Sequence, residues 1–383
     1  MEYSSKILVR IVGLLFLITP FVMSTADEDT AMLLNASYLP SFVPTITSAL
    51  RWGIMGILLV VFFYNFQKGQ IRLSNSVFFL ILFYALQLAY ALVDGEDYSR
   101  FFALTALSFV VPPVLGLVIQ KKILLKFFAY CILFFLFISY VLNGHMILSG
   151  QRFIGFMTNA NTMGISTVFW LVILLIARKA EAIRTKFFIV MLCLVLITMF
   201  VTGSRNAFVG IFLILFIYYL KHRTKLITVF AAIIPVFFAL SLFIDISFLT
   251  DRFINVSNAV EDSGRREVWE NATFMIDTNL WWGNGMANEE ILRMGNMHNV
   301  YIRFLLNMGL IFTVLSLVMY MLSIVTVVSS KRFVPLLLPG YLFVYALMNL
   351  GEDFFVGLGS SAFIYMLFIY GFINYYLTRP AVY

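Results

Sequence analysis

Apolar residues occur along the chain in long runs that short polar stretches separate. Most runs have about 17 to 25 residues, the length that an α-helix needs to cross the hydrocarbon core of a bilayer. Because lipid offers the backbone no hydrogen-bond partners, such runs form helices. The pattern therefore predicts an all-α, polytopic membrane protein with about twelve transmembrane helices.

The ends of the apolar runs place the predicted spans. The run at residues 297–328 is too long for one straight crossing, so we expect it to tilt or to extend beyond the bilayer. All spans belong to one integral membrane domain, residues 1–383, with one large loop at residues 247–296. The twelve predicted spans are residues 7–23, 48–66, 77–93, 101–119, 123–142, 162–177, 187–201, 206–220, 226–246, 297–328, 333–350 and 354–377.

Composition agrees with this class of protein. The chain is 62% hydrophobic and 12% charged, whereas soluble domains have about 25% charged residues. Cys131 and Cys193 both lie inside apolar runs, so we interpret them as buried small residues and not as a disulfide. The sequence has no cluster of cysteine and histidine with metal-ligand spacing, so we expect no metal and no cofactor.

The charges of the polar stretches predict the orientation. Alternate loops are basic ("QKGQIR", "QKKILLK", "RKAEAIRTK", "KHRTK", "SSKR"), and the N-terminal segment carries Lys6 and Arg10. Basic loops face the cytoplasm, so both termini are expected inside and the large loop outside. The N-terminal stretch also fits a cleavable signal peptide, an alternative that places the next loop outside as well.

Arginine is the only basic residue on the predicted outward side. All ten lysines fall on the cytoplasmic side, together with seven of the sixteen arginines. A guanidinium binds phosphate through two parallel hydrogen bonds, which an ammonium cannot do. Ion pairs with outward acids are the alternative for any single arginine. The nine outward arginines are Arg51, Arg100, Arg152, Arg205, Arg252, Arg265, Arg266, Arg293 and Arg303.

Two outward stretches place arginine beside the start of a span. "QRFIGFMTNAN" carries Arg152 and Asn161 and leads into the sixth span. "TGSRNAF" is a tight turn in which Ser204 can cap the eighth span and Arg205 lies at the lipid–water boundary. Arginines near helix N-termini suit a doubly charged anion, and a lipid-linked pyrophosphate is the natural candidate at the outer leaflet.

A third stretch, "SGRREVWENATFMIDTNLWWGNG", lies in the large loop and predicts a short amphipathic helix. The helix can start at Ser263 or Gly264, and we expect it to rest on the membrane surface with Arg265 and Arg266 at its positive end. Its apolar stripe consists of Val268, Trp269, Ala272, Met275 and Ile276.

The fourth stretch, "GNMHNVYIRFLLNMGLIF", puts His298, Asn299 and Tyr301 at the start of a span. An imidazole can accept a proton at neutral pH, and the amide of Asn299 can hold a sugar hydroxyl. From the residue chemistry alone, a structural role at the end of the span is an equal alternative for His298. The other two histidines, His145 and His222, are better explained as polar residues at span ends.

The order of these motifs resembles that of the O-antigen ligase and polymerase superfamily. The likeness covers about residues 150 to 312, and the first part of the chain matches only as a set of spans. The motifs, in chain order, are Arg152 with Gly155 and Asn161, Ser204–Arg205, Gly264–Arg265 with Trp269, Gly283–Gly285, and His298–Asn299 with Tyr301 and Gly309.

The resemblance implies a metal-independent, inverting glycosyltransferase of the bacterial inner membrane, with its active face in the periplasm. The donor is a glycan on undecaprenyl pyrophosphate, and the acceptor is a glycan or a lipid. It implies that Arg152 and Arg205 bind the pyrophosphate and stabilise it as it leaves, and that His298 orients or deprotonates the acceptor hydroxyl. The implied substrate-binding residues are Arg265, Arg266, Asn161, Asn299 and Tyr301.

Several alternatives remain open at this level. Within the superfamily, we favour a polymerase of lipid-linked repeat units over a ligase that transfers the glycan to lipid A-core, and a chain-length regulator is a possible partner. No feature of the sequence indicates a nucleic-acid partner. A flippase is less favoured because the spans are almost free of charge and show no repeat. A metal-dependent transferase would use Asp27, Glu28 and Asp29. Glu352 and Asp353 stand where acids would suit such a site, but we favour a solvated turn as the explanation for them.

Overall fold

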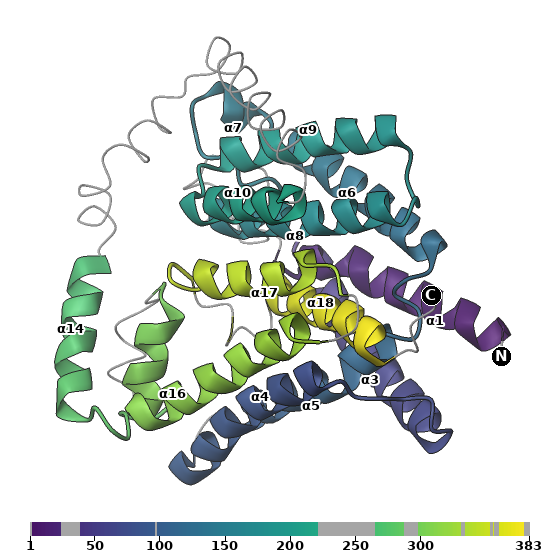
Figure 1. Cartoon of the computed structure of the whole chain (residues 1–383). Helices are drawn as coiled ribbons and strands as arrows, with labels where there is room; N and C mark the ends of the chain where they lie inside the picture. The colour runs from purple at the N-terminus through teal and green to yellow at the C-terminus, as the bar shows by residue number, and fades with distance from the viewer. Residues whose placement is uncertain are drawn as a thin grey trace. The chain divides into compact units, whose positions relative to one another are not determined.

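The computed structural model describes residues 2–23, 39–95, 98–220, 265–286, 298–330, 334–352, 355 and 360–378. These residues form α-helices joined by short turns, and no β-strand occurs among them (Figure 1). Eight of the described helices are long and apolar enough to cross a membrane. The prediction of an all-α polytopic membrane protein is therefore confirmed.

The helices agree with the predicted spans wherever the structure describes them. Helices occupy the first eight predicted spans and the last three, and the ninth, residues 226–246, lies outside the described residues. Two of these helices, α10 and α17, are shorter than the others. The helices in the predicted spans are α1 (Glu2–Ile18) with the 3₁₀ helix η1 (Thr19–Met23), α3 (Phe42–Gln67), α4 (Asn75–Asp94), α5 (Tyr98–Leu115), α6 (Lys122–Asn143), α8 (Ala160–Lys179), α9 (Thr185–Thr202), α10 (Arg205–Tyr219), α16 (Val300–Val328), α17 (Leu337–Met348) and α18 (Ser361–Thr378).

The helices form two compact units, and α3 contributes to both. Unit 1 comprises residues 1–54 and 120–256. Within it, α8 packs against α6, α9 and α10, and α1 packs against α6. Aromatic side chains fill the contact between α1 and α6, where the rings of Phe16 and Phe128 stack with centroids 4.2 Å apart. A short helix, α7 (His145–Leu148), follows α6.

Unit 2 comprises residues 55–119 and 257–383. Within it, α4 packs against α5 and α16, and α18 packs against α4, α5 and α17. Its core contains a cluster of rings around Phe355, whose centroid lies 4.7 Å from that of Tyr320. The buried hydroxyl of Tyr84 donates a 3.2 Å hydrogen bond to the carbonyl of Phe355, so the polar atom that the ring brings into the core has a partner.

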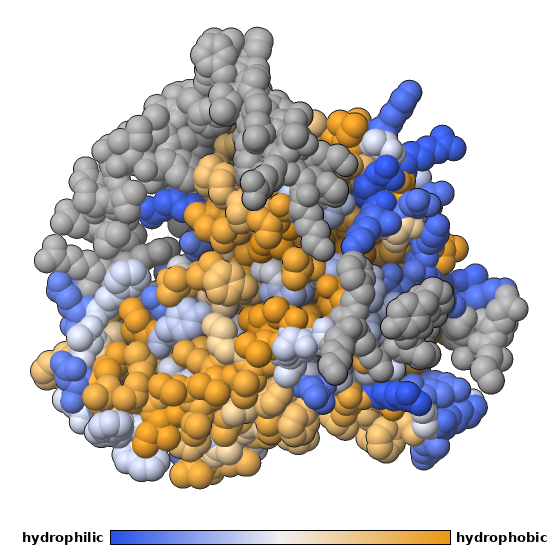
Figure 2. Space-filling view, in the orientation of Figure 1, coloured by the Kyte–Doolittle hydropathy of each residue, from blue (hydrophilic) through white to orange (hydrophobic). Residues whose placement is uncertain are grey.

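Large apolar side chains also cover much of the surface. Orange, hydrophobic residues form a broad area of the face shown in Figure 2. Val60, Phe137 and Val325, for example, are all more than half exposed. A water-soluble protein rarely exposes apolar patches of this extent, and a membrane-spanning helix needs them because they contact lipid. These side chains are the expected lipid-facing surface.

The predicted amphipathic helix exists as α14 (Arg265–Thr278) in unit 2. Its apolar stripe packs on α16, where Ala272 and Leu306 are fully buried and Val268, Met275 and Ile276 are partly buried around them. The expectation that this stripe rests on the membrane surface is therefore wrong for the central residues of the stripe, because α16 covers them. Phe274, on another side of α14, is largely exposed.

A break in α16 changes the expectation for the long run at residues 297–328. Gly309 has φ 68° and ψ −179°, a conformation that is essentially restricted to glycine. The loop after α14 crosses α16 at this point, so that Leu310 N donates to Leu280 O at 2.7 Å and Asn284 N donates to Leu306 O at 2.8 Å. The run is thus two helical segments, with the hydrogen bonds lost at the break replaced by bonds to the loop.

Replacing Gly309 with alanine should destabilise the protein by about 2 kcal/mol or more, because a side chain in this conformation is strained. The new Cβ would also lie 2.4 Å from the carbonyl oxygen of Trp281. Thermal unfolding in detergent measures the change. Gly53→Ala is the matched control, since a Cβ at Gly53 in α3 meets nothing within 4 Å. Equal melting temperatures for the two variants would contradict this view of the crossing.

Candidate functional site

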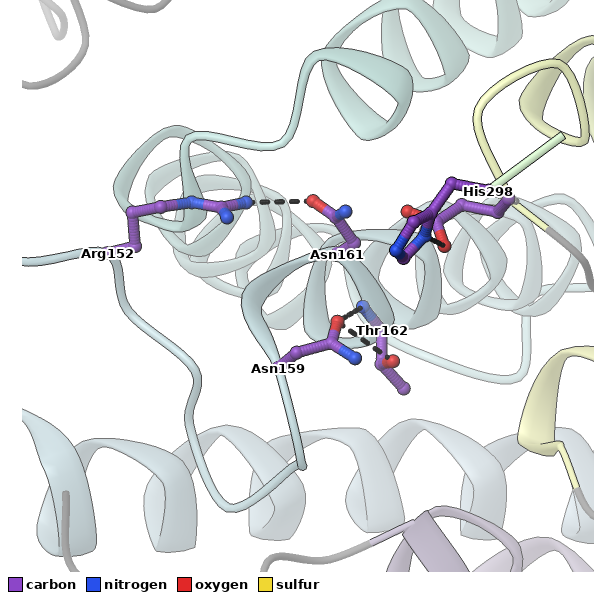
Figure 3. A network of polar contacts seen from close by, with 6 residues as sticks. Arg152, Asn159, Asn161, Thr162 and His298 are labelled. Atoms are coloured by element: carbon purple, nitrogen blue, oxygen red, sulfur yellow. Dashed lines mark hydrogen bonds and ion pairs between the residues drawn. The ribbon is translucent and has the colours of Figure 1, made fainter. Parts of the chain in front are cut away.

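Arg152 lies in the segment between α7 and α8 in unit 1, and two hydrogen bonds fix its guanidinium. Nε donates to the carbonyl of Thr202 at 3.1 Å, and Nη2 donates to Oδ1 of Asn161 at 2.8 Å (Figure 3). The backbone beside it is also held, because Phe153 N donates to Val201 O at 2.9 Å. The sequence-predicted pair Arg152 and Asn161 is therefore in direct contact.

Gly155 explains how this segment fits against α6. Its φ is +60°, and a Cβ at this position would lie 2.7 Å from Oγ of Ser139. The side chain of Asn143, at the end of α6, donates a 2.5 Å hydrogen bond to the carbonyl of Gly155. A glycine is required because the segment turns in the left-handed region while it touches the helix.

Arg205 begins α10, directly after the turn that ends α9. Ser204 is the N-cap, as predicted, and its Oγ accepts a hydrogen bond from Ala207 N at 3.4 Å. The Arg205 side chain is half-buried. Since Arg152 binds the carbonyl of Thr202, three residues before Arg205, the fold brings these two arginines to one turn although 53 positions separate them in the sequence.

This arginine cluster, defined as Arg152, Asn161, Thr202 and Arg205, is electrostatically suited to an anion. Asn161 lies in the first turn of α8, whose N-cap Asn159 accepts from Thr162 N at 2.8 Å (Figure 3). Two helices, α8 and α10, thus begin at the cluster. Helix N-termini carry partial positive charge, which adds to that of the two guanidinium groups.

His298 lies directly before α16 in unit 2 with its backbone in the left-handed region, at φ +48°. This conformation is uncommon for a residue with a side chain and is often found at functional sites. Nδ1 lies 3.5 Å from Oε2 of Glu352 (Figure 3), and the two side chains are 32% and 10% exposed. A nearly buried carboxylate therefore orients an imidazole that solvent or substrate can still reach.

The start of α16 is fastened to the end of α17. Val300 N donates to Asn349 O at 3.1 Å, and the hydroxyl of Tyr301 donates to the carbonyl of Ala346 at 2.6 Å. Asn299 is the N-cap, and its Oδ1 accepts from Tyr301 N at 3.0 Å and from Ile302 N at 3.2 Å. These contacts hold the turn that carries Glu352 beside His298, and we call His298, Asn299, Tyr301 and Glu352 the histidine cluster.

Glu352 is the residue of the histidine cluster that was not predicted from the sequence as a site residue. Its interpretation as part of a solvated turn is wrong, because the side chain is buried and pairs with His298. Asp353, its neighbour, lies outside the described residues. The signal in the sequence that could have revealed its role is an acidic residue just after a predicted membrane span. A carboxylate at such a place needs a partner.

The remaining predicted residues have simpler positions. Asn299 and Tyr301 both make structural hydrogen bonds at the start of α16. Arg265 and Arg266 are the first two residues of α14. All residues of the arginine cluster belong to unit 1, and all residues of the histidine cluster belong to unit 2.

Comparison with known proteins identifies part of the chain. The sequence model of a family described as O-Antigen ligase matches residues 188–317. The matched region contains Arg205, α14 and His298, while Arg152 and Glu352 lie outside it. A comparison with curated proteins gives no match.

Proposed function

Residues 188–317 match the model of the family described as O-Antigen ligase, and from this premise we propose that the chain is a polymerase of lipid-linked glycans. It joins oligosaccharide repeat units carried on undecaprenyl pyrophosphate into a surface polysaccharide. The observation that carries the proposal is that the matched region contains both Arg205 and His298. The resemblance implies that Arg205 binds the leaving pyrophosphate and that His298 acts on the acceptor hydroxyl.

In this proposal the arginine cluster binds the pyrophosphate of the donor. The guanidinium of Arg152 is held in place by Thr202 and Asn161, so little side-chain entropy is lost when an anion binds. Arg205 adds a second guanidinium at the same turn. Negative charge grows on the pyrophosphate as the glycosidic bond breaks, and groups already aimed at that charge lower the barrier.

The histidine cluster acts on the acceptor in the same proposal. The carboxylate of Glu352 holds the ring of His298 through Nδ1, and the proposed acceptor of the hydroxyl proton is Nε2. The hydroxyl then attacks the anomeric carbon from the face opposite the pyrophosphate, so that the configuration inverts. Asn299 uses its carbonyl oxygen as the N-cap, and its NH₂ group is the proposed donor to a sugar hydroxyl.

Arg265, Arg266 and Tyr301 complete the proposed set of substrate-binding residues. The two arginines stand at the N-terminal end of α14, where the helix dipole favours an anion. The Tyr301 oxygen donates its proton to Ala346 O, so it serves a sugar hydroxyl only as an acceptor. The proposed location is the bacterial inner membrane, with both clusters facing the periplasm and both termini in the cytoplasm.

A ligase is the second candidate, because the matching family model carries that description. The two activities share the donor and differ in the acceptor. Deletion of the gene distinguishes them through the surface glycan that remains. A single repeat unit on lipid A means that a polymerase was lost, whereas long chains left on undecaprenyl pyrophosphate mean that a ligase was lost. Loss of every outward-facing intermediate would contradict both and indicate a flippase.

Replacing Glu352 with glutamine should lower the turnover rate about tenfold or more, because the imidazole loses its charged partner. The affinity for the donor should change little, since the arginines that bind it are unchanged. Steady-state rates at several donor concentrations measure both quantities, with Glu270→Gln on the exposed side of α14 as the control. A normal turnover rate would contradict the positioning role.

A further inference from the structure

Unit 2 contains a polar pocket of about 490 Å³ where α4 begins and α16 and α18 end. It lies at the end of α16 opposite to His298, which precedes the first residue of that helix. The pocket therefore belongs to neither the arginine cluster nor the histidine cluster. Its lining includes Arg72, Ser74, Thr326, Ser329 and Thr378.

A buried network of hydrogen bonds fixes the walls of this pocket. The side chain of Asn374 in α18 accepts from Ser74 N at 2.9 Å and donates to Arg72 O at 3.0 Å. Ser76 in α4 donates to Ser323 O in α16 at 2.7 Å. Asn374, Ser76 and Ser323 are all buried. The three helix ends are thus held together, and a ligand would find the pocket already formed.

One wall of the pocket offers positive charge and hydrogen-bond donors. Arg72 supplies an exposed guanidinium. Ser74 is the N-cap of α4, and its Oγ accepts from Val77 N at 3.4 Å. The backbone N–H groups at the start of a helix carry partial positive charge and have no partner inside the helix. This wall suits a phosphate group.

The other wall offers acceptors. The hydroxyls of Thr326, Ser329 and Thr378 donate to carbonyls of their own helices at 3.0, 2.7 and 2.7 Å. Their protons are engaged, so what they present to the pocket is lone pairs. The C-terminal ends of α16 and α18 add the partial negative charge of their last carbonyls. This wall suits an ammonium group that still carries N–H bonds.

We propose that the pocket binds a zwitterion in which a phosphate and a primary ammonium group are two carbons apart, as in the phosphoethanolamine headgroup of a membrane phospholipid. The phosphate lies at Arg72 and the start of α4, and the ammonium group lies at the ends of α16 and α18. By the orientation that the sequence predicts, "QKGQIR" and "SSKR" place the pocket at the cytoplasmic leaflet. The proposal does not depend on the glycan-transfer activity.

Lipid selectivity of the full-length protein tests the proposal. Delipidated protein in detergent is titrated with phosphatidylethanolamine, phosphatidylcholine and phosphatidylglycerol of identical acyl chains, and bound lipid is counted by native mass spectrometry. We expect phosphatidylethanolamine to bind about tenfold more tightly than the other two, the effect of one charge-assisted hydrogen bond. Equal binding of the three lipids, or tighter binding of phosphatidylglycerol, would overturn the proposal that the pocket binds a zwitterion.

Variants assign the binding to this pocket. Arg72→Gln should weaken the binding of phosphatidylethanolamine about tenfold, and Arg184→Gln, at an exposed arginine before α9, should leave it unchanged. If Arg72→Gln does not fold, a phosphatidylethanolamine with a photoreactive group beside its headgroup replaces it. Cross-links of wild-type protein to residues 72–75 or 326–330 support the proposal, and cross-links only elsewhere would overturn it.

The source of the zwitterion is decided by competition. Glycerophosphoethanolamine, which lacks acyl chains, is added at increasing concentration to protein that carries bound phosphatidylethanolamine. If only millimolar concentrations displace the lipid, the ligand is a membrane phospholipid, as proposed. If the soluble compound binds as tightly as the lipid, the same pocket serves a soluble phosphoethanolamine compound, and the assignment to a membrane lipid is wrong.

Discussion

Replacing His298 with asparagine should lower the rate of glycan transfer by at least about 100-fold, because the imidazole is the group proposed to take the proton of the acceptor. Asparagine is the informative replacement. It adopts positive φ more readily than alanine, so it keeps the backbone at φ +48° while it removes the base. The amount of lipid-linked product formed over time by the purified variant measures the effect.

His145→Asn is the matched control for this experiment, since His145 is an exposed histidine in α7, outside both clusters. It should transfer glycan at the wild-type rate. Both variants should insert into the membrane and give a single symmetrical peak in detergent. Normal chain length and rate in the folded His298→Asn protein would remove His298 from the mechanism.

Arg205→Lys should lower the rate of transfer by at least about tenfold although the positive charge is kept. A lysine ammonium cannot form the two parallel hydrogen bonds that a guanidinium makes with phosphate oxygens. The loss should appear in the turnover rate, because the charge that is stabilised develops in the transition state.

Arg100→Lys is the control, because Arg100 is another half-buried arginine on the predicted outward side, in α5 and outside the arginine cluster. It should keep the wild-type rate. The double variant Arg152→Lys/Arg205→Lys should lose more activity than either single variant. If Arg205→Lys is fully active, the residue serves only the orientation of the chain in the membrane.

Features set by local sequence were predictable. The apolar runs gave the helices, because a run of this length has no other way to satisfy its backbone in lipid. Ser204 was identifiable as an N-cap from the residues directly around it. The contact of Arg152 with Asn161 was predictable because only nine positions separate the two residues. Arg152 lies in the segment before α8, and Asn161 lies in the first turn of α8.

Features that depend on contacts between distant segments were not predictable. The pairing of His298 with Glu352 joins residues 54 positions apart, and its only signal in the sequence is an acid beside an apolar run. The break at Gly309 follows from the loop that crosses α16 there, which hydropathy does not record. For the same reason the apolar stripe of α14 indicated an amphipathic helix correctly but not the helix that covers it.

The central claim is that the chain transfers a glycan from a lipid pyrophosphate to a second lipid-linked glycan. Purified protein in nanodiscs, given only undecaprenyl-pyrophosphate-linked repeat units and a metal chelator, tests it most directly. Mass spectrometry of the lipid products should show chains of two or more repeat units, with one undecaprenyl pyrophosphate released for each bond formed. No lengthened chain under these conditions, with transfer appearing only after lipid A-core is added, would contradict the claim.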